Sequence, residues 1–301
     1  YKRQLLITVG SEKTPRTVSL VLVFATASVA AKNVRAADGC AATRLIPVFL
    51  SPVPSSQTAA GWPTSVSLRI VNNCAQPLTD GRVLVSFSTN DPSISLTSEG
   101  DGRWSGTWAA RTVNAKVTLS AQARSTTPVF EGSGKLEMGV RADATRPLID
   151  PGGVRGLASQ LEGRPVPMAG PVLILGSQLV PEADIAIISP LPTELKGTSA
   201  LIAGKLLRLN SVTATRMEGV LPSGIPDSTP LQLIVRRGNT YSVPEPVIVT
   251  LAEPAIFTTS GTGVGQGRVY AVEEDGRRFL ADSERPLKPG DRMALLCSGL
   301  G

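Results

Sequence analysis

In the stretch TSVSLRIV, residues 64–71, polar and apolar side chains alternate from Ser65 to Ile70. The apolar members of this alternation are Val66, Leu68 and Ile70, and serine or arginine stands between them. In an extended strand, successive side chains point to opposite sides, so a period of two puts all three apolar groups on one side. The stretch therefore predicts a β-strand with one buried and one solvated side.

The same alternation recurs in GRVLVSFST (residues 81–89), AKVTLSAQA (residues 115–123) and GKLEMGV (residues 134–140). Turn-forming clusters such as NNCAQPLTDG and SEGDG separate these segments. The 29 glycines and 24 prolines among 301 residues also suit many short strands joined by turns. We therefore predict an all-β chain with an immunoglobulin-like antiparallel β-sandwich over residues 37–143.

Two tryptophans in GDGRWSGTW, residues 100–108, are candidate functional residues. Trp104 and Trp108 are four positions apart, so on a strand they share a face. They would either fill the sandwich core, which their small neighbours favour, or form an exposed binding platform. With the strand Arg82–Phe87, the segment Gly102–Trp108 resembles the bacterial immunoglobulin-like modules of large surface proteins.

Residues 144–170 are rich in proline and glycine, which predicts a linker. A second β region follows over residues 171–253, beginning with PVLILGSQL. It resembles the TIG-type immunoglobulin-like domain, and this resemblance implies positions that turn the chain or fill a core. Those positions are Val172, Ile174, Gly176, Leu179, Leu221, Pro222 and Val235.

The last 48 residues, 254–301, begin with a glycine-rich stretch, AIFTTSGTGVGQG. Its glycines fail the spacing of a dinucleotide fingerprint at both Gly261 and Gly263, and β-like sequence follows instead of a helix. We expect these glycines to supply positive φ angles and close packing. The blocks PAIFTTSGTGVGQG, EDG, KPGD and SGLG resemble the Solibacter-type C-terminal domain of acidobacterial secreted proteins. That resemblance implies a secreted β module, here truncated, with an exposed edge strand for self-association.

Residues 1–36 carry six basic side chains and one acidic one, followed closely by Cys40. The apolar run Val18–Ala31 is too short to span a membrane comfortably and predicts a secretory signal peptide. A buried first strand or helix is the alternative, and lipid attachment at Cys40 is another. Export would allow a disulfide between Cys40 and Cys74, closing a loop of about 35 residues worth about 3–4 kcal/mol. Cys297 lies in the apolar run MALLCSGL and is predicted to be a buried thiol. The alternative is that all three cysteines are free, buried thiols.

Composition excludes several kinds of chemistry. The chain has no histidine, so Ser-His-Asp triads and histidine-ligated metals are ruled out within it. Outside the leader, 24 basic residues balance 23 acidic ones, which argues against a nucleic-acid partner. Asp91, Glu99 and Asp101 lie near one another in the predicted loops and could bind calcium, although solvated turns are favoured.

We therefore predict a secreted or cell-surface structural, adhesive or display protein without catalytic residues or cofactors. Its partner would be an extracellular protein or polysaccharide, and it would touch the membrane only through the signal peptide. The alternatives are a polysaccharide-binding module of a larger secreted enzyme, an extracellular filament subunit and a small hydrolase that uses paired carboxylates.

Overall fold

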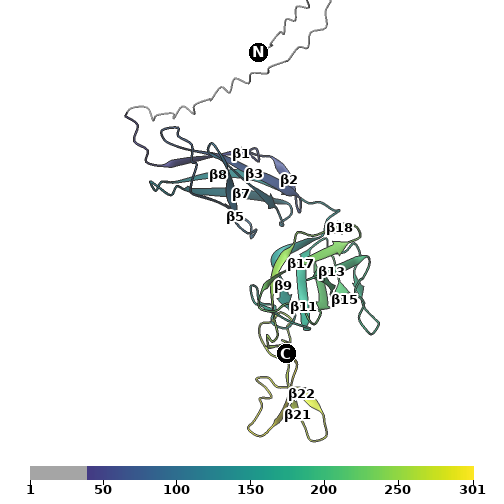
Figure 1. The fold of residues 1–301 in the computed structure, drawn as a ribbon. Helices are drawn as coiled ribbons and strands as arrows, with labels where there is room; N and C mark the ends of the chain where they lie inside the picture. Colours follow the sequence, from purple (N-terminus) through teal and green to yellow (C-terminus); the bar gives the residue numbers. More distant parts are fainter. Residues whose placement is uncertain (1–38) are drawn as a thin grey trace, which may run out of the picture. The chain divides into compact units, whose positions relative to one another are not determined.

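The computed structural model of the chain describes residues 39–301, and the predicted signal peptide over residues 1–36 lies outside them. The described part is built from β-strands and contains no helix. Figure 1 shows two β-sandwiches following one another along the chain, in purple to teal and in teal to green, and a small yellow sheet near the C-terminus. The predicted all-β fold of tandem immunoglobulin-like sandwiches is confirmed.

The first sandwich pairs its strands in the order β1-β3-β6-β5-β4-β7-β8-β2. Strand β5 pairs with β6 on one side and with β4 on the other, so it joins the two layers. The strands are β1 (Leu45–Ser51), β2 (Gln57–Ala59), β3 (Pro63–Asn72), β4 (Arg82–Phe87), β5 (Ile94–Gly100), β6 (Arg103–Ala109), β7 (Ala115–Arg124) and β8 (Glu131–Arg141).

The period-two pattern produces the core of this sandwich. Val66, Leu68 and Ile70 on β3 are fully buried, and the serines and arginine between them face outward. Burying one such side chain contributes about 1.5–3 kcal/mol. Trp108 lies in the same core and stacks on Phe87, with ring centroids 4.6 Å apart.

The first strand of the sandwich is divided between the two layers. Strand β1 pairs antiparallel with β3, and β2 pairs parallel with β8. Where β1 passes β8, a Cβ on Gly132 would lie 2.1 Å from the Leu45 carbonyl oxygen, and one on Gly134 would lie 2.8 Å from that of Pro47. Glycine is therefore required for the two backbones to approach this closely.

The second sandwich divides its first strand in the same way. Strand β9 pairs antiparallel with β11, and β10 pairs parallel with β19. The two layers are β12-β15-β16-β11-β9 and β10-β19-β17-β13-β14, and β18 is attached to β17. The strands are β9 (Leu148–Gly156), β10 (Val166–Pro167), β11 (Pro171–Ser177), β12 (Asp184–Ile185), β13 (Thr198–Ile202), β14 (Lys205–Leu206), β15 (Arg208–Val212), β16 (Arg216–Val220), β17 (Pro230–Arg237), β18 (Thr240–Tyr241) and β19 (Glu245–Thr250).

The predicted linker over residues 144–170 is therefore wrong, because this stretch contains β9 and β10. Proline and glycine are tolerated there since both strands lie at sheet edges, where fewer backbone groups need partners. Gly176 on β11 faces β9 closely, and a Cβ on it would lie 2.0 Å from the Leu148 carbonyl oxygen. Among the TIG-type positions predicted to fill a core, five are at most 2% exposed: Val172, Ile174, Leu179, Leu221 and Val235.

The C-terminal region forms two small sheets, β20-β24 and β22-β21-β23. Its glycine stretch is a loop in which Gly261, Gly263 and Gly265 all have positive φ. A Cβ on Gly263 would lie 1.8 Å from the Ser159 carbonyl oxygen, so the glycines serve conformation and packing, as predicted. The strands are β20 (Ala255–Ile256), β21 (Val269–Val272), β22 (Arg278–Leu280), β23 (Arg292–Leu295) and β24 (Cys297–Ser298).

The close passage of β1 over β8 yields a stability prediction. Gly132→Ala should lower the free energy of unfolding by about 1–3 kcal/mol, because the new methyl group meets a backbone oxygen that cannot turn away. The matched control is Gly139→Ala on the same strand, where the nearest atom is the flexible Gln57 side chain at 3.1 Å. Urea unfolding should show the control within about 0.5 kcal/mol of the wild type. Equal losses in both variants would contradict this role for Gly132.

Candidate binding surface

The two tryptophans predicted as a possible platform are both in the core. Trp104 is 4% exposed and Trp108 is 3% exposed. The Trp104 indole N–H donates to the Leu78 carbonyl at 3.2 Å, and that of Trp108 donates to the Asp91 carboxylate at 3.1 Å. The platform interpretation is wrong, because the strand turns both rings inward and their polar edges are satisfied there.

The three carboxylates considered for calcium are separately engaged. Asp91 is 6% exposed and accepts hydrogen bonds from Trp108, from the Thr89 hydroxyl at 3.1 Å and from the Arg111 backbone N–H at 3.2 Å. Glu99 accepts from the Ser105 hydroxyl. Asp101 pairs with Arg69 at 3.2 Å. Within residues 39–301, no group of three or more acidic or cysteine side chains is placed to hold a metal ion.

Glu245 is the other buried carboxylate among the described residues, at 4% exposure. It accepts a hydrogen bond from the Gly152 backbone N–H at 2.8 Å and forms an ion pair with Arg111. Desolvation raises the pKa of Asp150 and the charge of Arg155 opposes the rise, while the Asp150 side chain still reaches solvent.

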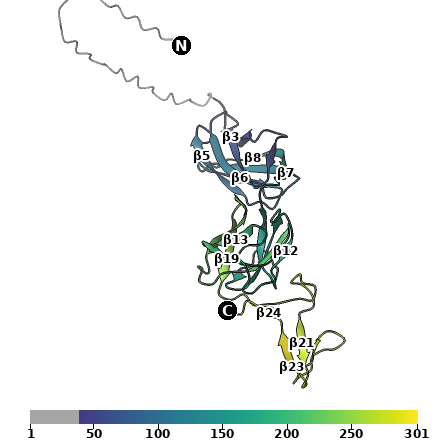
Figure 2. The same ribbon diagram turned by 90° about the vertical axis from the view of Figure 1, so that its right-hand side faces the viewer.

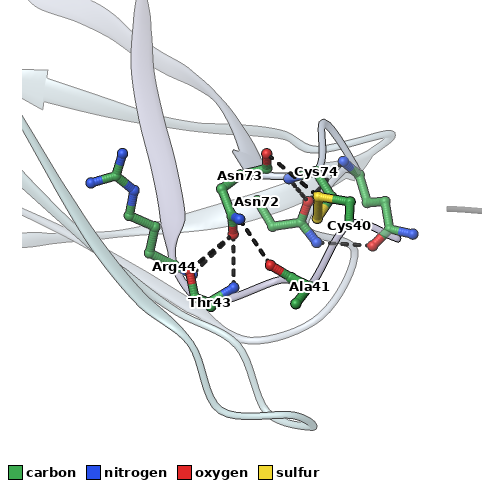
Figure 3. The surroundings of a disulfide bond; sticks show 8 residues. Cys40, Ala41, Thr43, Arg44, Asn72, Asn73 and Cys74 are labelled. Atoms are coloured by element: carbon green, nitrogen blue, oxygen red, sulfur yellow. Dashed lines mark hydrogen bonds between the residues drawn. A yellow bond between two sulfur atoms is a disulfide. The ribbon is translucent and has the colours of Figure 1, made fainter. Parts of the chain in front are cut away.

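The structure joins Cys40 to Cys74 in a disulfide, the pair that the sequence favours. Figure 3 shows how Asn73, beside Cys74, holds the segment that follows Cys40. Its side chain accepts from the backbone N–H groups of Thr43 at 2.7 Å and Arg44 at 3.3 Å, and it donates to the Ala41 carbonyl at 3.0 Å. The covalent bridge and these hydrogen bonds together fix the start of the first sandwich. Cys297 is a free, half-buried cysteine.

Trp62 is the tryptophan that lies at the surface, and it was not among the predicted binding residues. It is 48% exposed in the turn before β3, and the Arg146 guanidinium lies 4.7 Å from its ring centroid. Its indole N–H donates to Asp143. Hydrogen bonds from the Thr145 hydroxyl and backbone N–H, and then from Trp62, lower the pKa of Asp143 from 3.8 to about 2. The indole N–H of Trp62 and the carboxylate of Asp143 are therefore occupied by hydrogen bonds within this cluster.

Strands β4, β7 and β8 present a broad, solvated outer side in the first sandwich. Alternate residues on these strands point inward and are buried, so the others point outward. We call the outward side chains of these three strands the basic face, since five of them are Arg or Lys. The basic face comprises Arg82, Leu84, Ser86, Lys116, Thr118, Ser120, Gln122, Arg124, Glu131, Ser133, Lys135, Glu137, Gly139 and Arg141.

The second sandwich exposes apolar side chains at the end of β12, which Figure 2 labels, and in the loop that follows; we call Ile185, Ile187 and Ile188 the isoleucine loop. Ile185, Ile187 and Ile188 are 66%, 96% and 60% exposed. Sequence periodicity could not single out this loop, because a run of isoleucines equally predicts a buried strand. Contiguous exposed apolar side chains of this kind are typical of contact surfaces for other molecules.

No family model matches the chain, and no curated protein matches it, so the resemblances seen in the sequence stay predictions. Among solved structures, the fibronectin(III)-like modules of Clostridium thermocellum CbhA align at 15% identity over 68% of this chain and 94% of that one, with a TM-score of 0.24. Domains 5–6 of the S-layer protein SbsC align at 12% identity over 68% and 99%, with a TM-score of 0.24. The Yersinia pseudotuberculosis adhesin InvE aligns at 12% identity over 76% and 69%, with a TM-score of 0.29.

Within residues 39–301, no helix has the length and hydropathy needed to cross a membrane.

The buried hydrogen bonds of Asp91 predict a large effect of its removal. Asp91→Ala should lower the free energy of unfolding by about 2–4 kcal/mol, because it leaves the Trp108 indole and the Arg111 backbone N–H buried without an acceptor. Glu99→Ala is the matched control, since Glu99 is exposed, and it should change stability by less than about 1 kcal/mol. Denaturant unfolding followed by tryptophan fluorescence measures both, and a loss confined to Glu99→Ala would contradict the assignment.

The lowered pKa of Asp143 predicts how stability depends on pH. A carboxylate whose pKa falls on folding stabilises the protein above its unfolded pKa of 3.8, and this contribution is lost as the pH falls toward about 2. The melting temperature of the wild type should therefore exceed that of Asp143→Asn most clearly above pH 3.8. The two should converge near pH 2, and a gap that does not change with pH would overturn this account.

Proposed function

We propose that this chain is a structural and adhesive module that works at a cell surface or in the extracellular medium, through surface contact and without catalysis. Two sandwiches in series provide a scaffold, and side chains on loops and sheet faces engage the partner. The proposal applies to the part of the chain that the structure describes.

The exposed isoleucine loop carries this proposal. A solvated loop that keeps Ile187 at 96% exposure gains nothing from folding alone, because the apolar surface remains in water. Contact with a partner would bury Ile185, Ile187 and Ile188 together and recover that free energy. The cost of leaving them exposed is therefore explained by a binding role.

The disulfide supports the extracellular setting. Bridges such as Cys40–Cys74 persist in oxidising compartments and are uncommon where thiols are kept reduced. The disulfide therefore supports an extracellular location. This argument is independent of the isoleucine loop, because the disulfide lies in the first sandwich and the loop in the second.

The carboxylate-based hydrolase is the competing function, and the positions of the acidic groups disfavour it. Asp91 and Glu245 are committed to buried hydrogen bonds within the described residues. That chemistry needs a pair of carboxylates in one concave site. Two hollows on the outward face of β4, β7 and β8 are each lined by a single carboxylate, Glu131 in one and Glu137 in the other.

Cell-binding assays test the adhesive role. Beads coated with the full chain should bind cells of the native host, and the double variant Ile187→Ser/Ile188→Ser should lose most of this binding because its loop no longer offers apolar surface. The matched control is Val129→Ser/Leu251→Ser, which removes side chains that are 56% and 63% exposed elsewhere. Equal binding by both variants and the wild type would reject the loop as the contact site.

The location is tested separately by fractionation of the native host with an antibody to the chain. We expect the protein outside the cytoplasm, and peptide mapping without reductant should recover Cys40 and Cys74 in one linked pair. A cytoplasmic protein with both thiols reduced would overturn the extracellular part of the proposal.

A further inference from the structure

Strand register places the charges of the basic face in rows across three strands. Arg82 on β4 lies opposite Arg124 on β7, and Arg124 lies opposite Glu131 on β8. Two rows further on, Ser120 lies opposite Lys135. Lys116 and Arg141 lie at the other end of the same face. Positive charge therefore extends along the whole length of β7, which is about 30 Å for a ten-residue strand.

The charge of this face differs from that of the opposite face of the same sandwich. The basic face has five basic side chains and two acidic ones, Glu131 and Glu137. The outward side of β3, β5 and β6 has two of each: Arg69, Arg103, Glu99 and the adjoining Asp101. The near-neutral balance outside the leader thus conceals a local excess of positive charge.

Most of these basic groups are free to bind. Arg124 has a carboxylate partner, Glu131, at 3.6 Å, and both side chains of that pair are well exposed, so the pair is weak. Among residues 39–301, no carboxylate oxygen lies within ion-pair distance of Arg82 or Lys135. Arg82 and Arg124 are also directly opposed, an arrangement that favours an anion between them.

The shape and the uncharged groups of this face suit an extended polymer. Open grooves of about 540 and 510 Å³ lie at its two ends, and each has two basic groups and one carboxylate in its lining. The first has Arg82, Arg124 and Glu131, and the second has Lys116, Arg141 and Glu137. Between them the sheet presents short hydroxyl and amide side chains, namely Ser86, Thr118, Ser120, Gln122 and Ser133.

We propose that the basic face binds an acidic polysaccharide rich in uronic acids, lying along β7. Arginine forks match carboxylates, and the hydroxyl and amide groups between them match sugar hydroxyls. None of the described outward side chains on this face is aromatic, which disfavours a single-stranded nucleic acid because its bases would find no stacking partner. The inference rests on the adhesive function proposed above and gives it a ligand class.

Affinity measurements with purified full chain and polygalacturonate test this proposal, with uncharged dextran as the neutral polymer. We expect binding to polygalacturonate that weakens with added salt, and none to dextran. Arg124→Gln/Lys135→Gln should weaken the affinity roughly fivefold, because two exposed charge contacts are lost. The matched control, Arg69→Gln/Arg103→Gln, removes the same charge and also one exposed ion pair from the opposite face, and it should remain within about twofold of the wild type.

Several outcomes would overturn the proposal. These are no binding to polygalacturonate at low salt, equal binding to dextran, or equal loss in both double variants. Tighter binding to single-stranded poly(dT) than to polygalacturonate would assign the face to nucleic acid instead. Cell adhesion through the isoleucine loop is measured with different residues on the other sandwich, so a failure of the polysaccharide proposal and a failure of the adhesive proposal give different results.

Discussion

The closure of each sandwich depends on one strand that serves both layers. Two sheets packed face to face leave open sides, and a first strand divided between them closes one side with backbone hydrogen bonds to each. This is possible only where two backbones come unusually close. Gly132 on β8 provides this contact with β1 in the first sandwich, and in the second Gly176 on β11 lets β9 approach closely within one layer. The cores, the outward faces and the loops all take their positions from this closure.

Within that frame, the two buried carboxylates of the described residues, Asp91 and Glu245, both have hydrogen-bond partners. Asp91 accepts from Trp108 and Arg111, so a charge that would otherwise cost several kcal/mol holds a large ring and a loop in place. From the sequence alone, Asp91 is an acidic residue in a predicted loop and was therefore considered as a calcium ligand. Its burial makes it structural, and function is left to the surface, where charged and apolar side chains stay in water.

Local patterns in the sequence predict what is locally determined. Alternation over residues 64–71 predicts β3 and its inward face, and the spacing of Trp104 and Trp108 predicts their shared side. Strands β9 and β10 are missed because their hydrogen-bond partners lie on β11 and β19, far along the chain, and their own proline and glycine are typical of linkers. The basic face is missed for a similar reason, since it exists only once the register of β4, β7 and β8 is known.

The Cys40–Cys74 bridge has a mechanical consequence. A pulling force applied to the chain before Cys40 passes through the sulfur atoms directly to Cys74. Strands β1, β2 and β3 all lie within the closed loop, so they carry none of that load and cannot be peeled away from the sandwich one by one. Reduction would release 34 residues, about 120 Å of extended chain, to the force. The bridge thus makes the first sandwich an inextensible link at its N-terminal end for as long as its surroundings remain oxidising.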